Sequence, residues 1–253
     1  MNVIVSNCCY HYVCFDFESM QKTNSLSVII PAFNEEAGIN NAVTENLKVL
    51  KNFQIDFEII IVDDGSSDGT ETIIRDNFLN HANIRCHFKK KNEGFGSACK
   101  KGIELAGKEN VILVSVDSPL TSEIISLFYQ HINNADILVG YRIERKGYTW
   151  RMKLNSLMFH WLVSHLFDMK LKDYNWLHLY KREIFQHITI EYSGIFMLAE
   201  VLIKARRNDF RIVEIPVEMI KRSGGVATAG SWKTAFQTAG DLFSFYFTIH
   251  KRK

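Results

Sequence analysis

Short, continuously apolar runs alternate with amphipathic stretches along the first half of the chain. Residues 28–30 and 59–62 are apolar at every position, which predicts strands buried on both faces of a parallel sheet. Between them, residues 38–52 place apolar side chains at helical spacing and leave the opposite face polar. Strands that alternate with helices over short connections predict an α/β fold with a mostly parallel sheet and right-handed crossovers.

The same alternation continues to the end of the chain. Further strands are predicted at residues 83–88, 111–116, 136–142 and 212–217. Further helices are predicted at residues 70–80, 97–106, 151–167, 196–207 and 232–250. The helices are expected to flank the sheet, and the last one is aromatic and amphipathic.

Carboxylates follow two of the predicted strands at the point where each strand ends. Asp63 and Asp64 come directly after the second strand, and Asp117 follows the strand that ends at residue 116. Ligands in open α/β sheets bind at the carboxyl ends of the strands, so these three side chains are expected to converge on one crevice. The alternative is an Asp-, Ser- and Gly-rich turn in which an acid such as Asp68 caps the next helix. Adjacent acids at one strand end favour the ligand site.

Two other turns carry candidate chemistry. The first predicted strand stops at Pro31, which cannot donate to a sheet ladder, and leads into Asn34 and Glu35. Farther along, Gly94 and Gly96 precede a predicted helix, but their spacing does not match a dinucleotide-binding fingerprint. These glycines are expected instead to let the loop approach a ligand closely.

Composition narrows the classes of protein that fit. The chain has 253 residues, 47% of them hydrophobic, and a net charge of +2, which suits one large domain or one domain with an appendage. Basic residues gather only in the short run 89–91, so a nucleic-acid partner is not expected. No apolar stretch reaches the roughly 18 residues of a membrane-spanning helix. Residues 1–24 lack the basic start of a secretory signal, and no role is assigned to them.

The cysteines favour a reducing compartment. Their number is odd and their spacing does not match paired metal ligands: they are Cys8, Cys9, Cys14, Cys86 and Cys99. Reduced thiols in a cytosol are therefore expected rather than a disulfide framework.

The predicted helix at residues 151–167 has an apolar stripe that allows two interpretations. The stripe consists of Leu154, Leu157, Met158, Trp161, Leu162 and Leu166. Packing against the core is the first interpretation of such a stripe. The second is contact with a membrane interface, because Trp150 and several basic residues flank the stripe. The helix at 232–250 is aromatic and is followed by basic residues, so peripheral membrane contact stays open.

Three segments in order resemble the family 2 glycosyltransferases, and among them the polyprenyl-phosphate sugar transferases of the dolichyl-phosphate mannose synthase type. SVIIPAFNEE is similar to the family's first strand and turn, and EIIIVDDGSSDGT to its V-D-D-G-S-x-D-x-T signature. NEGFGSACKKGIELA is similar to its N-x-G-x-G-x-A-x-x-x-G segment. The resemblance covers about residues 26–228, where EIPVEMIKRSGG matches the family's tail. It implies a GT-A fold with a mostly parallel sheet flanked by helices.

The resemblance also implies a donor site for a nucleotide-sugar. A single metal ligand is implied, Asp117, which would hold Mg²⁺ or Mn²⁺ against the diphosphate through hard oxygen ligands. Ser115 stands where the family's D-x-D motif has its first acid, which departs from the pattern. The donor-binding residues implied by position are Pro31, Phe33, Glu35, Asp63, Asp64, Gly94, Ser115 and Asp117.

Three residues are implied for catalysis. Asp173 is the first candidate for the base that deprotonates an acceptor hydroxyl, and Glu200 is the second; a phosphate acceptor would need no base. A structural pairing of Glu200 within its helix is the equally weighted alternative. Arg222 is expected to assist the departure of the diphosphate. The segment KDYNWLHLYKRE, which contains Asp173, lacks the glycine and phenylalanine of the family pattern.

The combined expectation is an inverting glycosyltransferase. It would move a sugar from a UDP- or GDP-linked donor to a polyprenyl phosphate or a growing surface glycan. The expected location is cytoplasmic, with peripheral contact at the inner face of the membrane. The expected division is an extension at 1–24, the GT-A domain at 25–230 and an amphipathic helix at 231–253. The alternatives are a non-catalytic nucleotide-sugar binder, and a nucleotidyltransferase, which the acidic PAFNEE turn disfavours.

Overall fold

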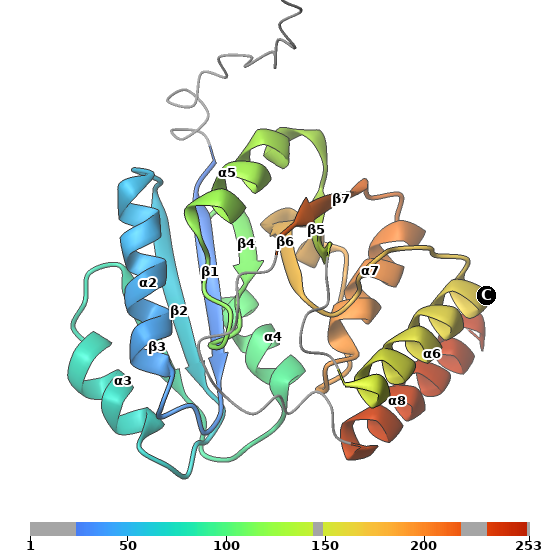
Figure 1. The fold of residues 1–253 in the computed structure, drawn as a ribbon, viewed down its shortest axis with the longest axis horizontal. Helices are drawn as coiled ribbons and strands as arrows, with labels where there is room; N and C mark the ends of the chain where they lie inside the picture. The colour runs from blue at the N-terminus through green and yellow to red at the C-terminus, as the bar shows by residue number, and fades with distance from the viewer. Residues whose placement is uncertain (1–23, 144–148, 219–231, 252–253) are drawn as a thin grey trace, which may run out of the picture.

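The computed structural model describes residues 24–143, 149–218 and 232–251. They form one seven-stranded sheet with the order β3-β2-β1-β4-β6-β5-β7 (Figure 1). The strands are β1 (Leu26–Ala32), β2 (Phe57–Asp63), β3 (Ile84–Phe88), β4 (Asn110–Leu113), β5 (Ile137–Arg142), β6 (Leu177–Lys181) and β7 (Ile212–Val217). All neighbouring strands pair in parallel except β6, which is antiparallel to both β4 and β5. The predicted α/β fold with a mostly parallel sheet is confirmed.

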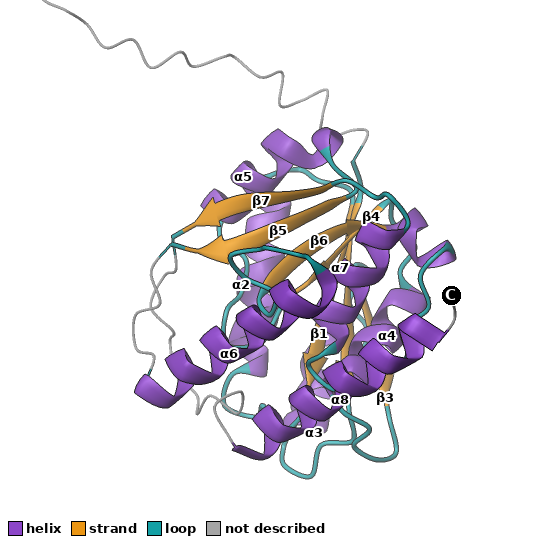
Figure 2. Ribbon diagram, turned by 90° about the vertical axis from the view of Figure 1, so that its right-hand side faces the viewer, coloured by secondary structure: helices purple, strands orange, loops and turns teal. Residues whose placement is uncertain are grey.

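Helices cover both faces of the sheet (Figures 1 and 2). They are α2 (Ile39–Asn52), α3 (Thr70–Phe78), α4 (Phe95–Leu105), α5 (Ser122–His131), α6 (Trp150–Phe167), α7 (Met197–Arg207) and α8 (Trp232–Lys251), with short 3-10 turns at Ile132–Asn134 and Arg182–Gln186. One apolar cluster lies between the sheet and helices α2, α3 and α5. A second cluster joins the opposite face to α4, α6, α7 and α8. The strands are therefore apolar at successive positions because both of their faces are buried.

Two strands differ from the sequence-based expectation. Strand β6 was not predicted, and β4 ends at Leu113 instead of residue 116. Beyond β4, the amide of Val114 still donates to the carbonyl of Ile29 at 2.9 Å, but the amide of Ser118 turns back to the carbonyl of Ser115 at 3.1 Å. Asp117 therefore lies in a turn shortly after the strand, rather than directly after the strand's last residue.

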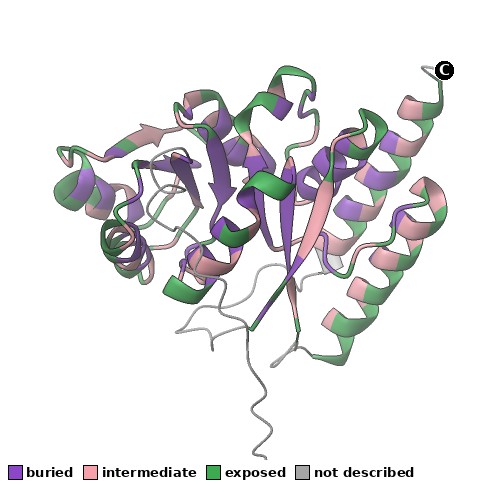
Figure 3. Cartoon of the chain, turned by 90° about the horizontal axis from the view of Figure 1, so that it is seen from above, coloured by how far each residue is buried: buried purple, intermediate pink, exposed green. Residues whose placement is uncertain are grey.

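Helices α6 and α8 lie side by side on the outside of the molecule (Figures 1 and 2). The expectation that the α6 stripe packs in the core is wrong for most of its members. The core instead receives Phe159 and Val163, while Leu157 and Trp161 remain 67% and 63% exposed. Figure 3 shows exposed residues along the outer sides of both helices.

The last helix belongs to the body of the molecule. Leu242 and Phe245 of α8 are buried in the second apolar cluster. None of the helices that the structure describes is long and apolar enough to span a membrane. Within the described ranges, Cys86 and Cys99 are free thiols. The expected extension at 1–24 lies outside the described residues apart from its last position.

Candidate functional site

Asp63 is the buried acid at the end of β2. Its backbone pairs with Ala32 at the end of β1, and its side chain is fully buried. The carboxylate accepts a hydrogen bond from the Ser66 hydroxyl at 2.5 Å and a longer one from the Ser66 amide at 3.4 Å. Burial raises the pKa of Asp63 above its ordinary value, although the hydrogen bonds from Ser66 oppose that rise.

The loops after β1 and β2 are bound to each other. The amide of Asn34 donates to the Ser66 hydroxyl at 2.9 Å, and the amide of Ser67 donates to the Asn34 side-chain oxygen at 2.8 Å. Asn34 adopts a left-handed conformation with φ 55°, which an asparagine tolerates better than most residues. The two turns therefore form one unit at the carboxyl edge of the sheet, beside the half-buried Pro31 and the 42% exposed Phe33.

Glu35 and Asp117 interact electrostatically at the same edge. Burial is the main cause that raises the pKa of Glu35, and the negative charges of Asp117 and Asp68 raise it further. The Ser115 hydroxyl donates to Asp117 at 2.8 Å and so orients this carboxylate. Asp68 accepts the amide of Thr70 at 3.0 Å, but the N-cap position of α3 is Gly69, so Asp68 supports the start of the helix from one residue before the cap.

The acidic residues fit a metal that also uses substrate oxygens. No cluster of three or more His, Cys, Asp or Glu side chains with metal-binding geometry occurs in the part of the chain that the structure describes. Mg²⁺, however, commonly takes only one or two protein carboxylates and completes its octahedron with waters and phosphate oxygens. Asp117 is the one carboxylate placed for that role by the sequence, and its oxygen ligand type suits Mg²⁺ or Mn²⁺.

Asp64 is occupied by the protein itself. Only 2% of the residue is exposed, and its carboxylate lies 2.9 Å from the Lys89 ammonium. It also accepts the amides of Gly94 at 2.7 Å and Glu93 at 3.2 Å. These contacts give Asp64 a structural role: it fixes the turn that precedes α4. The predicted role of Asp64 in donor binding stays a prediction. Its contacts favour an indirect role, in which Asp64 positions the turn before α4.

Gly94 approaches protein backbone rather than open space. Its φ of 101° is one that side-chain-bearing residues rarely adopt, and a Cβ there would lie 2.6 Å from the Ser193 carbonyl oxygen. The amide of Gly96 donates to the same carbonyl at 2.6 Å. The close approach expected of these glycines is therefore present, but Ser193 is the group approached.

Glu200 stabilises the segment that carries Ser193. It is fully buried in α7 and accepts the amides of Glu191 at 2.9 Å and Tyr192 at 3.1 Å. Lys204, one turn farther along α7, donates to it at 2.7 Å. Both carboxylate oxygens thus accept hydrogen bonds from the protein, which favours the structural alternative for Glu200. Its catalytic role stays a prediction.

Asp173 lies in a buried polar group near the end of β5. Its carboxylate is 3.1 Å from the guanidinium Nε of Arg142, and the residue is only 3% exposed. Arg142 also donates to the carbonyl of Asn175 at 3.2 Å and stacks over Trp176 at 5.1 Å. The pairing with Arg142 fixes the Asp173 carboxylate in place, and its role as a catalytic base stays a prediction. Arg222, the third residue predicted for catalysis, lies outside the described residues.

His178 adds a group to this side that the sequence did not single out. Its side chain is completely buried on β6, and its Nδ1 hydrogen bonds with the Tyr180 hydroxyl at 2.7 Å. Burial lowers the pKa of His178 to about 4, so the imidazole is neutral near pH 7. Strand β6 was not predicted, so no pattern in the sequence singled out this histidine.

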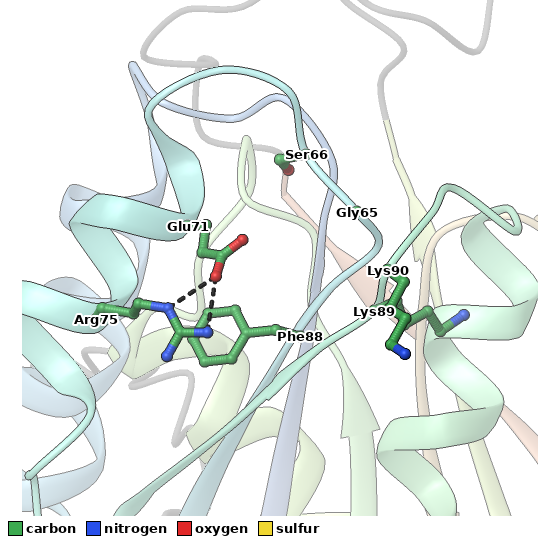
Figure 4. A pocket seen from close by; sticks show the side chains of 7 residues that line it. All are labelled: Gly65, Ser66, Glu71, Arg75, Phe88, Lys89 and Lys90. Atoms are coloured by element: carbon green, nitrogen blue, oxygen red, sulfur yellow. Dashed lines mark hydrogen bonds and ion pairs between the residues drawn. The ribbon is translucent and has the colours of Figure 1, made fainter.

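A cavity of about 300 Å³ is lined in part by Ser66, the hydrogen-bond partner of Asp63 (Figure 4). Its lining residues are Gly65, Ser66, Glu71, Arg75, Phe88, Lys89 and Lys90. The Arg75 guanidinium stacks 3.9 Å above the Phe88 ring and pairs with Glu71 at 2.7 Å. Sequence reasoning missed these residues, although the basic run at 89–91 and the i, i+4 pair on α3 were the available signals.

The comparisons with known proteins agree with this geometry. The profile described as "Glycosyl transferase family 2" matches residues 27–204. The chain belongs to glycosyl transferase family 2. The family membership predicted from the three motifs is therefore confirmed.

Curated relatives include two polyprenyl-phosphate enzymes. The undecaprenyl-phosphate 4-deoxy-4-formamido-L-arabinose transferase of Proteus mirabilis is 26% identical over 168 residues, which are 66% of this chain and 52% of that protein. The dodecaprenyl-phosphate galacturonate synthase of Rhizobium johnstonii is 26% identical over 229 residues, 88% of this chain and 66% of that protein. An uncharacterised glycosyltransferase of Synechocystis is 30% identical over 150 residues, 59% of this chain and 47% of that protein. The chain spans about half the length of the first and third of these relatives.

Solved structures confirm the fold. Glucosyl-3-phosphoglycerate synthase of Mycobacterium tuberculosis, in complex with Mn²⁺, UDP-glucose and phosphoglyceric acid, superimposes with a TM-score of 0.72 at 16% identity. That match covers 94% of this chain and 86% of the synthase. Mannosyl-3-phosphoglycerate synthase of Rubrobacter xylanophilus gives a TM-score of 0.70 at 13% identity, over 94% of this chain and 79% of that one. The predicted GT-A architecture is thereby confirmed.

Proposed function

We propose that this chain transfers a sugar from a nucleotide-sugar donor to an acceptor, with inversion at the sugar. The observation that carries the proposal is the edge where Asp63, Glu35 and Asp117 follow neighbouring parallel strands of a family 2 domain. Open α/β sheets bind ligands at this edge. The supporting comparison is with synthases crystallised with Mn²⁺ or Mg²⁺ and uridine diphosphate.

The nucleoside binds at the unit formed by the turns after β1 and β2. Asp63 accepts hydrogen bonds from N–H groups of the base. Its carboxylate is buried and is held in one orientation by the hydrogen bond from Ser66, so it accepts in a defined direction. Pro31, Phe33 and Glu35 line the same edge on the β1 side. The cavity at Arg75 and neighbouring lysines lies next to this pocket and supplies positive charge near it.

Asp117 would hold Mg²⁺ or Mn²⁺ for the diphosphate of the donor, because a carboxylate oxygen suits either ion. When bound, the metal supplies positive charge that stabilises the departing diphosphate. Ser115 holds Asp117 in its orientation by donating a hydrogen bond, so a serine in place of the first acid of D-x-D still contributes to the site. Arg222 assists the leaving group from the segment after β7.

The acceptor binds on the β5 and β6 side, near Asp173 and Arg142. A polyprenyl phosphate or a growing surface glycan fits the proposal, and the names of the Proteus and Rhizobium relatives support the first. For a hydroxyl acceptor, Asp173 takes the proton and Arg142 holds its carboxylate in place. A phosphate acceptor is already ionised and needs no base, so Asp173 would then take no proton.

The test of this function is a panel of UDP- and GDP-sugars. A ligand that binds only the native state raises the unfolding temperature, so the correct donor is expected to stabilise the protein more with Mn²⁺ than without it. Metal-dependent release of the nucleoside diphosphate from that donor then distinguishes an enzyme from a non-catalytic nucleotide-sugar binder. A protein that no donor stabilises, with or without the metal, would contradict the proposal.

We also propose that the protein contacts the inner, cytoplasmic face of a membrane peripherally. The support is the outer side of α6 and α8, where large apolar side chains stay exposed: Trp150, Leu154, Leu157, Met158, Trp161, Phe236, Phe243 and Phe247. Basic residues accompany them, including Arg151 and Lys153 on α6 and Lys251 on α8. Each basic residue near an anionic surface contributes about 1 kcal/mol, which allows reversible attachment.

The membrane contact predicts that the protein floats with anionic vesicles at low salt. Burying a leucine side chain contributes about 1.5–3 kcal/mol, so Leu157→Gln is expected to reduce vesicle binding roughly tenfold. Leu79→Gln at the C-cap of α3 is the matched control, because Leu79 is also exposed but lies on the opposite side of the sheet. Equal flotation of the two variants, or no flotation of the unmodified protein, would contradict the contact.

A further inference from the structure

A second cavity lies away from the donor edge, where three helices end. It measures about 350 Å³ and is formed by the carboxyl-terminal ends of α6, α7 and α8. Its polar lining consists of His165 and Asp168 from α6, Arg206 and Arg207 from α7, and His250 from α8. Apolar side chains complete the walls. In Figure 1 these helix ends lie toward the marked C-terminus, while β1 and β2 point to the opposite, lower edge.

The charge of this cavity is positive. Two guanidinium groups and two imidazoles face one carboxylate, Asp168. Neither Arg206 nor Arg207 forms an ion pair or a side-chain hydrogen bond with any residue in the described ranges, and both are exposed. The two guanidinium groups are therefore available to a ligand.

The arginines at this cavity are not needed to pair with the carbonyl groups at the helix ends. Cations are favourable at helix carboxyl termini, where the last carbonyl groups lack partners. At the end of α7, however, backbone amides already donate hydrogen bonds to these carbonyl groups. The amide of Asn208 donates to the carbonyls of Lys204 and Ala205 at 3.1 and 3.0 Å, and the amide of Asp209 donates to that of Arg206 at 3.2 Å. The arginine side chains form none of these bonds.

We propose that this cavity binds a phosphate group, either free as a soluble phosphate ester or as the headgroup of an anionic lipid. Two neighbouring guanidinium forks match the oxygens of a phosphate in geometry and charge. A cavity of this size also accommodates the organic substituent of an ester against its apolar walls. The site is separate from the proposed donor site and does not depend on sugar transfer.

The structure supplies its own reporter for the site. The exposed Trp161 ring stacks on His165 with the centroids 5.3 Å apart and the planes within 7°. His165 lines the cavity, so a phosphate bound there changes the surroundings of this indole. We therefore expect a saturable change in tryptophan fluorescence when the full chain is titrated with glycerol 1-phosphate at constant ionic strength. Trp161→Phe should remove the change and so identify its source.

A double substitution tests the arginines. Arg206→Gln with Arg207→Gln is expected to lower the affinity for glycerol 1-phosphate tenfold or more, because charge-assisted hydrogen bonds are lost. The control is Lys48→Gln with Lys51→Gln on α2, which changes the net charge equally on the far side of the sheet. His250→Gln, a single change at the other wall of the cavity, gives a second variant if the double one unfolds at a lower temperature.

Vesicles distinguish the two sources of phosphate. Phosphatidylcholine vesicles with and without phosphatidylglycerol are compared by co-sedimentation with the same variants. If the arginine variant loses only the phosphatidylglycerol-dependent binding, the ligand is a headgroup; if it loses only the response to glycerol 1-phosphate, the ligand is soluble. If it matches the lysine control in both assays, or if the unmodified protein responds in neither, the proposal is overturned.

Discussion

Asp117→Asn is expected to lower kcat/KM for sugar transfer about 10²–10³-fold. Removal of one group that stabilises developing charge in a preorganised site typically has an effect of this size. Asparagine keeps the shape of the side chain but offers no negative charge to a divalent cation. The activity of the unmodified protein should also disappear when EDTA removes the metal. Initial rates with Mn²⁺ at several concentrations measure both effects.

Ser115→Ala is the matched comparison. It removes only the hydrogen bond that the serine donates to Asp117 at 2.8 Å, which contributes about 1 kcal/mol, so a loss of roughly fivefold is expected. Equal losses in the two variants, or activity that survives chelation, would contradict a metal-binding role for Asp117. A second measurement is independent of activity: the negative charge of Asp117 helps to raise the pKa of Glu35, so that pKa should fall in Asp117→Asn.

Asp63→Asn should weaken nucleotide binding while the protein stays folded. Asparagine can still accept the hydrogen bond from Ser66, but it loses the charge that strengthens hydrogen bonds from a base. Such charge-assisted bonds contribute about 1.5–3 kcal/mol, which corresponds to a loss of affinity between about tenfold and a hundredfold. Asp63→Ala, which removes the acceptor altogether, should abolish measurable binding. Calorimetric titration with the nucleoside diphosphate measures all three proteins.

Asp63→Asn should also change how the free energy of unfolding depends on pH. Burial raises the pKa of Asp63 above its ordinary value of 3.8, so the native state holds this proton more tightly than the unfolded chain does. The contribution of Asp63 to the free energy of unfolding is therefore complete below the ordinary pKa and is lost as pH rises through the raised one. Asp63→Asn has no carboxyl group that titrates, so it does not lose stability in this way. Relative to the unmodified protein, the variant should gain stability in urea unfolding as the pH rises above the ordinary pKa of 3.8. Parallel curves for the two proteins would contradict a buried, raised Asp63.

The sequence predicted the strands and helices whose signals are local. The apolar runs around Ile59–Ile61 and Val28–Ile30 became β2 and β1 because strands buried on both faces have to be apolar throughout. Strand β6 escaped prediction because its five residues, Leu177–Lys181, mix a histidine, a tyrosine and a lysine with leucines. Its antiparallel place between β4 and β5 depends on pairing with distant strands, which no local pattern records.

The candidate site shows the same division. Asp63 and Asp64 are adjacent aspartates, and the sequence alone could not assign them different roles. The structure does so through partners far along the chain. Lys89 and the Gly94 amide contact Asp64, whereas among the described residues the Asp63 carboxylate bonds only with the nearby Ser66. The role of an acid thus depends on contacts that form only in the folded protein.

The Ser193 carbonyl behind Gly94 has a consequence for how the protein is made. Ribosomes release a chain from its amino end, and local α/β units can fold as they emerge. The glycine turn of the donor edge, however, is held by a residue synthesised almost a hundred positions later, through the bond from the Gly96 amide. Tyr192, its neighbour, packs in turn on Phe245 of the last helix. A nascent chain therefore lacks these supports for the glycine turn until residue 193 and then α8 have been translated.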